Sequence, residues 1–198
     1  MPKTLAQATT PRASVFDPNI RDTVYNIDDL NQIDPQTFFA ENYVTQGMKQ
    51  LLTETFKRLE GKSHNASGAF LLSQSMGGGK THNLLALGLL AKHPELRQSV
   101  MGAFYAPGGL GPVRVVTFSG RKTYTPLGIW GDIANQLGRR EVMKDFYAPL
   151  MSPGDQQWVD LLQGEPVLIL LDELPPYFEA VAAVEKSRRR HRGATDRG

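Results

Sequence analysis

The chain has 198 residues, 40% of them hydrophobic, and a formal net charge of +2, which suits one soluble globular domain. No run of about eighteen apolar residues occurs, so we expect no membrane span. The first residues lack the apolar core of a secretory signal, and the absence of cysteine excludes disulfides and cysteine-ligated zinc. We therefore expect a cytoplasmic protein. The four histidines are scattered without metal-ligand spacing, which favours surface or structural roles.

The small net charge conceals two regions of opposite sign. Residues 186–198 contain six basic residues against Asp196 alone, a net of +5, and subtracting this from +2 leaves −3 on the remaining 185 residues. The pI of about 8.9 therefore gives no argument that the body of the protein binds nucleic acid. The basic segment lacks an apolar period and is predicted to be a disordered tail. Such a tail either has no task or contacts phosphates nonspecifically.

The N-terminal part of the chain predicts a lead-in followed by two helices. Residues 1–24 contain three prolines and no helical period, which indicates an extended or disordered segment. Asp34 and Pro35 are suited to be the N-cap and first residue of a helix. Apolar residues within 48–59 recur at i, i+3, i+4 and i+7, which predicts a helix with one apolar stripe. Gly61 is expected to end it.

A glycine-rich loop follows at residues 74–81, with the sequence Gln-Ser-Met-Gly-Gly-Gly-Lys-Thr. It lies between a short apolar run, 69–72, predicted to be a strand, and a leucine-rich helix. This order is typical of a nucleoside triphosphate site, because glycines let backbone N–H groups and the helix N-terminus face the phosphates. Lys80 is predicted to reach the β- and γ-phosphates, and the Thr81 hydroxyl to bind Mg²⁺. Gln74 replaces the first glycine of the usual motif, so a flexible turn remains an alternative.

Helix and strand signals alternate after the loop. A nearly all-apolar helix, a β-branched strand, a longer helix and two shorter helices are expected at residues 80–91, 113–119, 125–137, 142–150 and 155–162. The order β-α-β-α-β indicates an α/β fold with a parallel sheet and right-handed crossovers. Gly120, Arg121 and Lys122 follow the β-branched strand at its carboxyl end, where ligands of such sheets lie.

The last predicted strand ends in two carboxylates. Residues 167–171 form an unbroken aliphatic run, typical of a strand buried on both faces, and Asp172 and Glu173 follow it. Asp172 is predicted to hold Mg²⁺ through water, and Glu173 to deprotonate the water that attacks the γ-phosphate. The adjacent pair favours ATP as the nucleotide. The alternative is a strand followed by solvated acids. Residues 175–176, two prolines, are expected to break the chain before a helix over 177–184.

Together the two motifs resemble the Walker A and Walker B elements of P-loop ATPases of the additional-strand, catalytic-glutamate division, which includes the AAA+ proteins. The resemblance implies a three-layer P-loop core, ATP and Mg²⁺ as ligands, and hydrolysis that drives a motor or switch. The residues it assigns to nucleotide binding are Ser75, Met76, Gly77, Gly78, Gly79, Lys80, Thr81 and His82. It assigns the metal to Thr81 and Asp172, and catalysis to Lys80 and Glu173.

Four longer stretches are similar to a more specific group, the large prokaryotic ATPases of undefined function encoded near DNA methyltransferases in phage-defence islands. These stretches are residues 39–48, 76–82, 125–130 and 170–177. In that group a triple-glycine loop after a non-glycine residue is usual. The resemblance implies a role in defence, with association to DNA or a DNA methyltransferase, and a homo-oligomer formed through the later part of the protein.

Members of that group are several times longer, and the fold they resemble adds a central strand and an arginine finger after Walker B. We therefore expect residues 25–185 to form a partial P-loop domain, truncated after the Walker B strand, and residues 186–198 to be foreign to the family through a shifted frame or truncated gene. Such a fragment should bind nucleotide weakly and hydrolyse little. Two alternatives remain: a catalytically incomplete nucleotide-binding fragment, and a nucleic-acid-binding protein acting through its basic tail.

Overall fold

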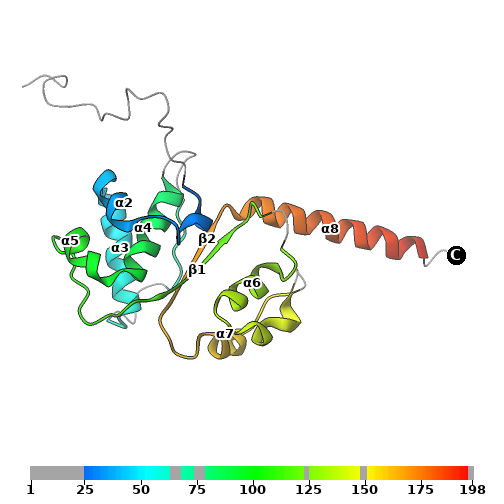
Figure 1. The fold of residues 1–198 in the computed structure, drawn as a ribbon. Helices are drawn as coiled ribbons and strands as arrows, with labels where there is room; N and C mark the ends of the chain where they lie inside the picture. The colour runs from blue at the N-terminus through cyan, green and yellow to red at the C-terminus, as the bar shows by residue number, and fades with distance from the viewer. Residues whose placement is uncertain (1–24, 63–67, 74–78, 123–124, 148–150, 196–198) are drawn as a thin grey trace, which may run out of the picture.

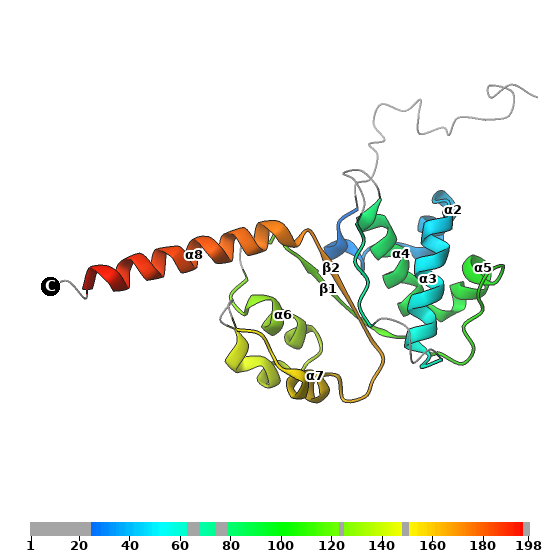
Figure 2. The same cartoon turned by 180° about the vertical axis from the view of Figure 1, so that it is seen from behind.

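A computed structural model of the chain describes residues 25–62, 68–73, 79–122, 125–147 and 151–195. Within them a two-stranded parallel sheet separates two groups of helices (Figures 1 and 2). Strand β1 (Arg114–Ser119) pairs with β2 (Val167–Asp172) over their whole length, so that Ser119 lies opposite Asp172 at the carboxyl ends. The predicted α/β class and parallel pairing are confirmed.

The first group of helices covers one face of the sheet. Its elements are the 3-10 turn η2 (Ile27–Asp29), α2 (Pro35–Glu41), α3 (Gln46–Leu59), α4 (Lys80–Lys92), the 3-10 turn η3 (Pro94–Leu96) and α5 (Arg97–Met101). The apolar helix α4 packs on both strands, and its residues from Leu85 to Ala91 are all buried. Leu168 and Leu170 of β2 contribute to the same core. A helix that is apolar all round is expected in such a place.

The second group covers the opposite face. It consists of α6 (Gly128–Gln136), the 3-10 helix η4 (Arg140–Phe146) and α7 (Asp155–Leu162). Val116 and Phe118 of β1 are buried there, with Ile169 and Leu171 of β2 packed against the same cluster. Alternate residues of each strand therefore pack in two cores, which is why β2 is apolar without interruption from Val167 to Leu171.

Helix α8 (Leu174–Thr195) leaves the carboxyl end of β2 and projects from the body (Figure 1). Its first turn is attached to α6, because the Tyr177 hydroxyl accepts a hydrogen bond of 3.1 Å from the Ile129 N–H. Pro175 and Pro176 lie inside this first turn, so the predicted chain break is wrong. Proline is tolerated there because the first helical N–H groups need no partner within the helix. The helix also includes residues 186–195, which the sequence analysis assigned to a disordered tail.

Local capping explains most of the helix boundaries. The Asp34 carboxylate accepts a hydrogen bond of 2.7 Å from the Thr37 N–H, and Pro35 is the first residue of α2, as predicted. Gly61 has a φ of 69° just beyond α3, as expected for a helix C-terminus. Helix α6 begins three residues later than predicted, because Thr125 and Gly128 form a turn in which the Gly128 N–H donates to the Thr125 carbonyl.

The strand predicted at residues 69–72 is absent from the structure. Residues 68–73 contain no helix or strand, and the side chains of Phe70 and Leu71 are 42% and 93% exposed. A strand requires a neighbouring strand to bond with its backbone, and the sheet of the described residues contains β1 and β2 but not this segment. The apolar sequence of this segment is therefore insufficient to make it part of the sheet.

Candidate nucleotide site

The C-terminal half of the glycine loop forms the start of α4. Gly79 is the N-cap of this helix and has a left-handed backbone, with φ of 74° and ψ of 24°. A non-glycine residue is disfavoured in this conformation. The first turn contains no acidic residue, so the positive end of the helix dipole is suited to an anion. Ser75, Met76, Gly77 and Gly78 lie outside the described residues.

The two predicted motifs meet in the structure. Thr81, in the first turn of α4, donates a hydrogen bond of 2.6 Å from Oγ1 to Oδ2 of Asp172, the last residue of β2. Asp172 is only 8% exposed. Residues that are 91 positions apart in sequence are therefore joined by a short hydrogen bond to a carboxylate, the stronger class of such bonds. The pairing of Thr81 with Asp172 as one candidate site was predicted from the motifs.

The backbone turns sharply after Asp172. Glu173 has a φ of 49°, in the left-handed region that few non-glycine residues occupy. Its N–H donates to Oδ1 of Asp172 at 3.0 Å, so both oxygens of the Asp172 carboxylate accept a bond from this site. The turn directs the two carboxylates differently: Asp172 is buried toward α4, whereas the side chain of Glu173 is 36% exposed.

Arg121 is the residue of this site to which sequence reasoning gave no role. It follows β1 at the carboxyl edge of the sheet, and its Nε forms an ion pair with Oε2 of Glu173. The Arg121 side chain is 70% exposed. The sequence contained a partial signal, since a basic residue just beyond a strand of a parallel sheet lies where ligands bind. The identity of its partner could not be read from that position.

His82 packs away from the Thr81–Asp172 contact, against the N-terminal helices. Its ring stacks on Phe38 with 4.6 Å between centroids, and Tyr25 lies at 6.4 Å. Burial lowers the pKa of His82, so the imidazole is neutral near pH 7. These contacts give His82 a packing role in the structure. Its assignment to nucleotide binding remains a prediction.

The donor set of Thr81 and Asp172 fits a magnesium ion. A hydroxyl and a carboxylate are hard oxygen ligands, and Mg²⁺ takes few protein ligands while keeping water and substrate phosphates in its shell. Within the described residues, no group of three His, Cys, Asp or Glu side chains could hold a metal by itself. A bound Mg²⁺ would depend on the nucleotide for part of its coordination, as in sites that bind metal and triphosphate together.

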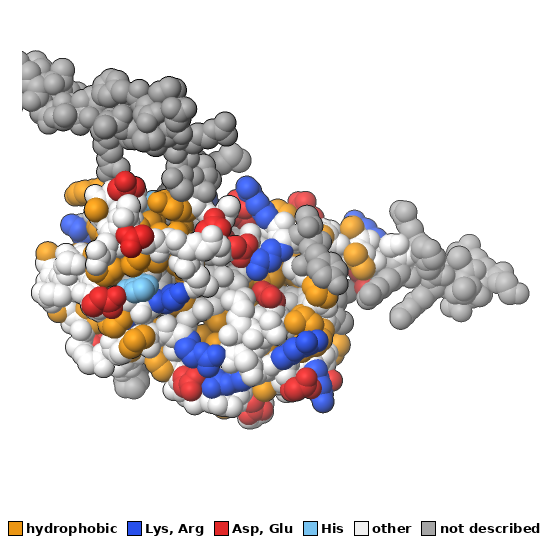
Figure 3. Space-filling view, in the orientation of Figure 1, with side chains coloured by type: hydrophobic (Ala, Val, Ile, Leu, Met, Phe, Trp, Pro, Cys, Tyr) orange, Lys and Arg blue, Asp and Glu red, His pale blue; other side chains and the backbone are white. Residues whose placement is uncertain are grey.

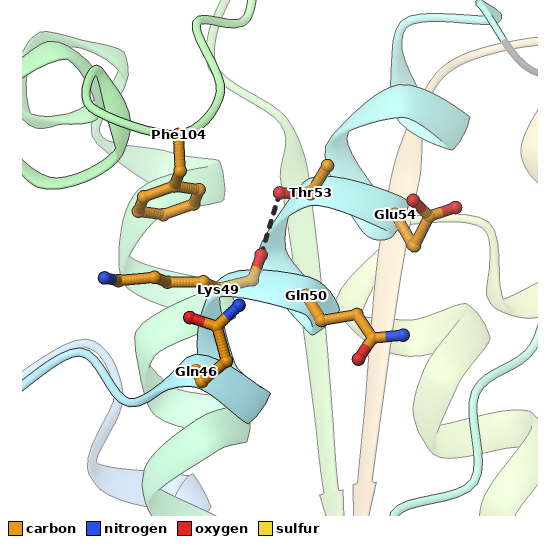
Figure 4. Close-up of a pocket in the computed structure, with 6 residues that line it drawn as sticks. All are labelled: Gln46, Lys49, Gln50, Thr53, Glu54 and Phe104. Carbon is orange, nitrogen blue, oxygen red and sulfur yellow. Dashed lines mark hydrogen bonds between the residues drawn. The ribbon is translucent and has the colours of Figure 1, made fainter.

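A separate groove lies on the outer surface of α3 and includes none of the predicted site residues. It has a volume of ≈ 380 Å³ and is lined by Gln46, Lys49, Gln50, Thr53, Glu54 and Phe104 (Figure 4). The Lys49 ammonium lies 5.9 Å from the centroid of the Phe104 ring.

On the face seen in Figure 3, basic and acidic side chains are interspersed without a large area of one sign. No described helix is long and apolar enough to cross a membrane.

The fold and site define an α/β protein in which a Gly-Lys-Thr helix start contacts an Asp-Glu strand end beside a parallel sheet. The comparison with known families matches residues 12–102 and 110–195 to the DUF499 N-terminal domain. The chain therefore belongs to the DUF499 family, which is associated with large ATPase-like proteins. The match includes residues 186–195, so the interpretation of these residues as foreign to the family is wrong. No curated protein and no solved structure matches the chain.

Proposed function

We propose that this chain binds ATP together with Mg²⁺ through the Gly-Lys-Thr start of α4 and the carboxyl end of β2. The observation that carries the proposal is the 2.6 Å hydrogen bond between Thr81 and Asp172. The glycine loop and the Asp-Glu strand end, which are far apart in the sequence, supply the two sides of this contact. The proposal is further supported by the burial of Asp172, which is 8% exposed, because a strand end with solvated acids would leave this carboxylate in water.

Each residue has a proposed role in this complex. Gly79 and the first turn of α4 present N–H groups to the phosphates, and Lys80 neutralises the β- and γ-phosphates. Thr81 and Asp172 hold Mg²⁺, which when bound neutralises charge on the triphosphate. Glu173 accepts a proton from the attacking water and so supports hydrolysis in the complete protein. The three-layer P-loop core belongs to this proposal, with the helices on both faces of the sheet as its support.

A second reading is that the chain binds nucleotide but turns it over poorly. The exposure of Leu71 favours it, because the segment that precedes the loop is not held in the sheet. Phosphoryl transfer depends on positioning and on charge stabilisation, so a loop whose preceding segment lies outside the sheet is expected to support it poorly. We therefore propose weak ATP binding and slow hydrolysis for this chain.

Calorimetric titration of the chain with ATP, in Mg²⁺ and in EDTA, tests the proposed binding. We expect binding that requires Mg²⁺ and is lost in Lys80→Ala, because the ammonium offsets phosphate charge. Thr81→Ser keeps the hydroxyl and should retain binding, whereas Thr81→Val should lose the dependence on Mg²⁺. Binding that is the same in Lys80→Ala and in the unsubstituted chain would reject the site.

Turnover measurements separate the two readings. Glu173→Gln should keep ATP affinity and abolish any phosphate release, because the amide cannot accept the proton. If phosphate release by the unsubstituted chain is near the uncatalysed rate while ATP binds, the binding module is the better description. Robust turnover by a purified monomer would contradict the proposal that the chain is catalytically incomplete.

The biological setting is proposed from the resemblance described above. We propose that ATP binding serves a DNA-related defence process, with DNA or a DNA methyltransferase as the partner and a homo-oligomer as the working form. The basic residues of 186–198 offer the simplest contact with DNA. Deleting that segment should reduce DNA binding and flatten its salt dependence. An unchanged salt slope would remove the segment from the proposed partner site.

A further inference from the structure

The carboxyl ends of β1 and β2 are held together by an unusually close backbone contact. The Gly120 N–H donates to the Asp172 carbonyl at 2.9 Å, which extends the parallel ladder by one bond beyond the strands. A Cβ atom placed on Gly120 would lie 2.1 Å from the Glu173 carbonyl oxygen and 2.8 Å from Cα of Leu174. Both are backbone atoms and cannot rotate away. Only glycine therefore fits this position without a shift of the chain at Glu173.

The residue above Gly120 is in a costly conformation. Glu173 has a φ of 49°, and the left-handed region is unfavourable for a side chain of this size. Such outliers persist only where the surroundings impose them, and they concentrate at functional sites. The neighbouring Asp172 lies on the regular strand and carries no such cost. A glycine at position 173 would relieve the strain, so the glutamate at this position has a cost in local stability.

Arg121 holds the side-chain carboxylate of Glu173. Its Nε pairs with Oε2 of Glu173, although both side chains are accessible to water. Exposed pairs contribute little to stability, so this ion pair matters mainly for where it holds the carboxylate. The adjacent cation does not share the task, since Lys122 pairs with Asp28 at 3.1 Å and lies 3.8 Å from Asp132.

We propose that Gly120 and Arg121 are positioning residues for Glu173, with Gly120 shaping its left-handed backbone and Arg121 directing its carboxylate. This inference rests on the proposed function of Glu173 as the group that activates water. It adds two residues that lie outside both nucleotide motifs. The strand end β1 thereby sets the geometry of the functional residue that follows β2.

A thermal-unfolding cycle tests the backbone half of the proposal without any nucleotide. Glu173→Gly should raise the melting temperature by roughly 2–6 °C, because strain is relieved. Gly120→Ala should lower it in the unsubstituted chain and lower it much less in the Glu173→Gly background, where the backbone can shift. Gly47→Ala is the matched control, since a Cβ there meets no atom within 4 Å. Additive effects, or a lower melting temperature for Glu173→Gly, would overturn the proposal.

NMR of the arginine side chains tests the Arg121 half. The Arg121 Nε–H resonance should shift in Glu173→Gln and remain unchanged in Glu165→Gln, where a different exposed carboxylate that pairs with Arg114 and Arg139 is altered. An Arg121 signal that ignores Glu173→Gln overturns this half. Where turnover is measurable, Arg121→Ala should lower kcat roughly ten- to a hundredfold at unchanged KM, with partial recovery in Arg121→Lys.

The outcome of the unfolding cycle and of the NMR experiment does not depend on whether the chain binds ATP. A chain that binds no ATP can still show the cycle and the arginine shift, which would keep the geometry and remove its proposed use. A chain that binds ATP through Lys80 but shows additive stability effects and no arginine shift would keep the nucleotide site and reject Gly120 and Arg121 as positioning residues.

Discussion

The contact between Thr81 and Asp172 gives a prediction that is independent of nucleotide. Replacing Thr81 by valine keeps the side-chain shape and removes the hydroxyl that bonds to the carboxylate at 2.6 Å. A hydrogen bond to a charged group contributes about 1.5–3 kcal/mol. Since this one is only partly buried, we expect about 1–2 kcal/mol, at or below the lower limit of that range. For a chain of 198 residues this corresponds to a fall in melting temperature of roughly 2–8 °C.

The assay is urea unfolding followed by circular dichroism in EDTA, so that neither metal nor ATP contributes. Thr81→Ser is the matched control, because it keeps the hydroxyl and should recover most of the loss. A double-mutant cycle with Asp172→Ala should give a coupling energy of about 1–2 kcal/mol. A Thr81→Val variant as stable as the unsubstituted chain, or one no less stable than Thr81→Ser, would refute the reasoning that this bond joins α4 to β2.

Three further predictions concern buried polar groups. Arg97 donates from a buried position to four backbone carbonyls, two at the end of α4 and two in the segment before β1. Arg97→Met should therefore cost about 2–4 kcal/mol in urea unfolding, against less than about 1 for the exposed Arg114→Met. Burial alone raises the pKa of Glu60, but hydrogen bonds from Lys62, from Tyr105 and from the Gly108 N–H lower this pKa overall. The stability that the ionised Glu60 contributes should therefore be lost as pH falls below about 4.5, and Glu60→Gln should remove this acid dependence. Burial lowers the pKa of His82, so its protonation favours the unfolded chain; stability should fall as pH drops below about 6.5, a decline that His82→Phe should abolish.

The two paired strands could be predicted from sequence because their residue composition indicates that they are buried. The runs that became β1 and β2 contain aliphatic or β-branched residues at successive positions, and each side of the sheet has its own core to receive them. Helix boundaries were also predictable where a cap is local. Asp34 bonds to a backbone N–H three residues ahead, and the glycines after α3 and α6 have positive φ.

The ion pair of the candidate site could not be predicted in the same way. Arg121 and Glu173 are brought together by the parallel register of β1 and β2, and no local pattern encodes that meeting. The left-handed backbone of Glu173 is equally hidden, since glutamate gives no sign of such a conformation. In our proposal, the glycine across the strand pair at position 120 leaves room for this backbone. The sequence shows that two carboxylates follow this strand, while their directions depend on contacts between distant residues.

Residues 69–72 show the opposite case, in which the sequence is typical of a strand but the segment lies outside the sheet of the described residues. Their composition resembles that of β2, yet Leu71 is 93% exposed whereas Leu170 is 2% exposed. The Gly-Lys-Thr turn is nevertheless held in place, because it is the start of helix α4, which packs on the sheet. A Cβ on Gly88 would lie 3.0 Å from Leu170 and 2.9 Å from Leu30, so α4 approaches β2 closely. The packing of α4 on β2 therefore positions the proposed phosphate-binding end of the site. It also keeps Thr81 in contact with Asp172, although residues 69–72 lie outside the sheet.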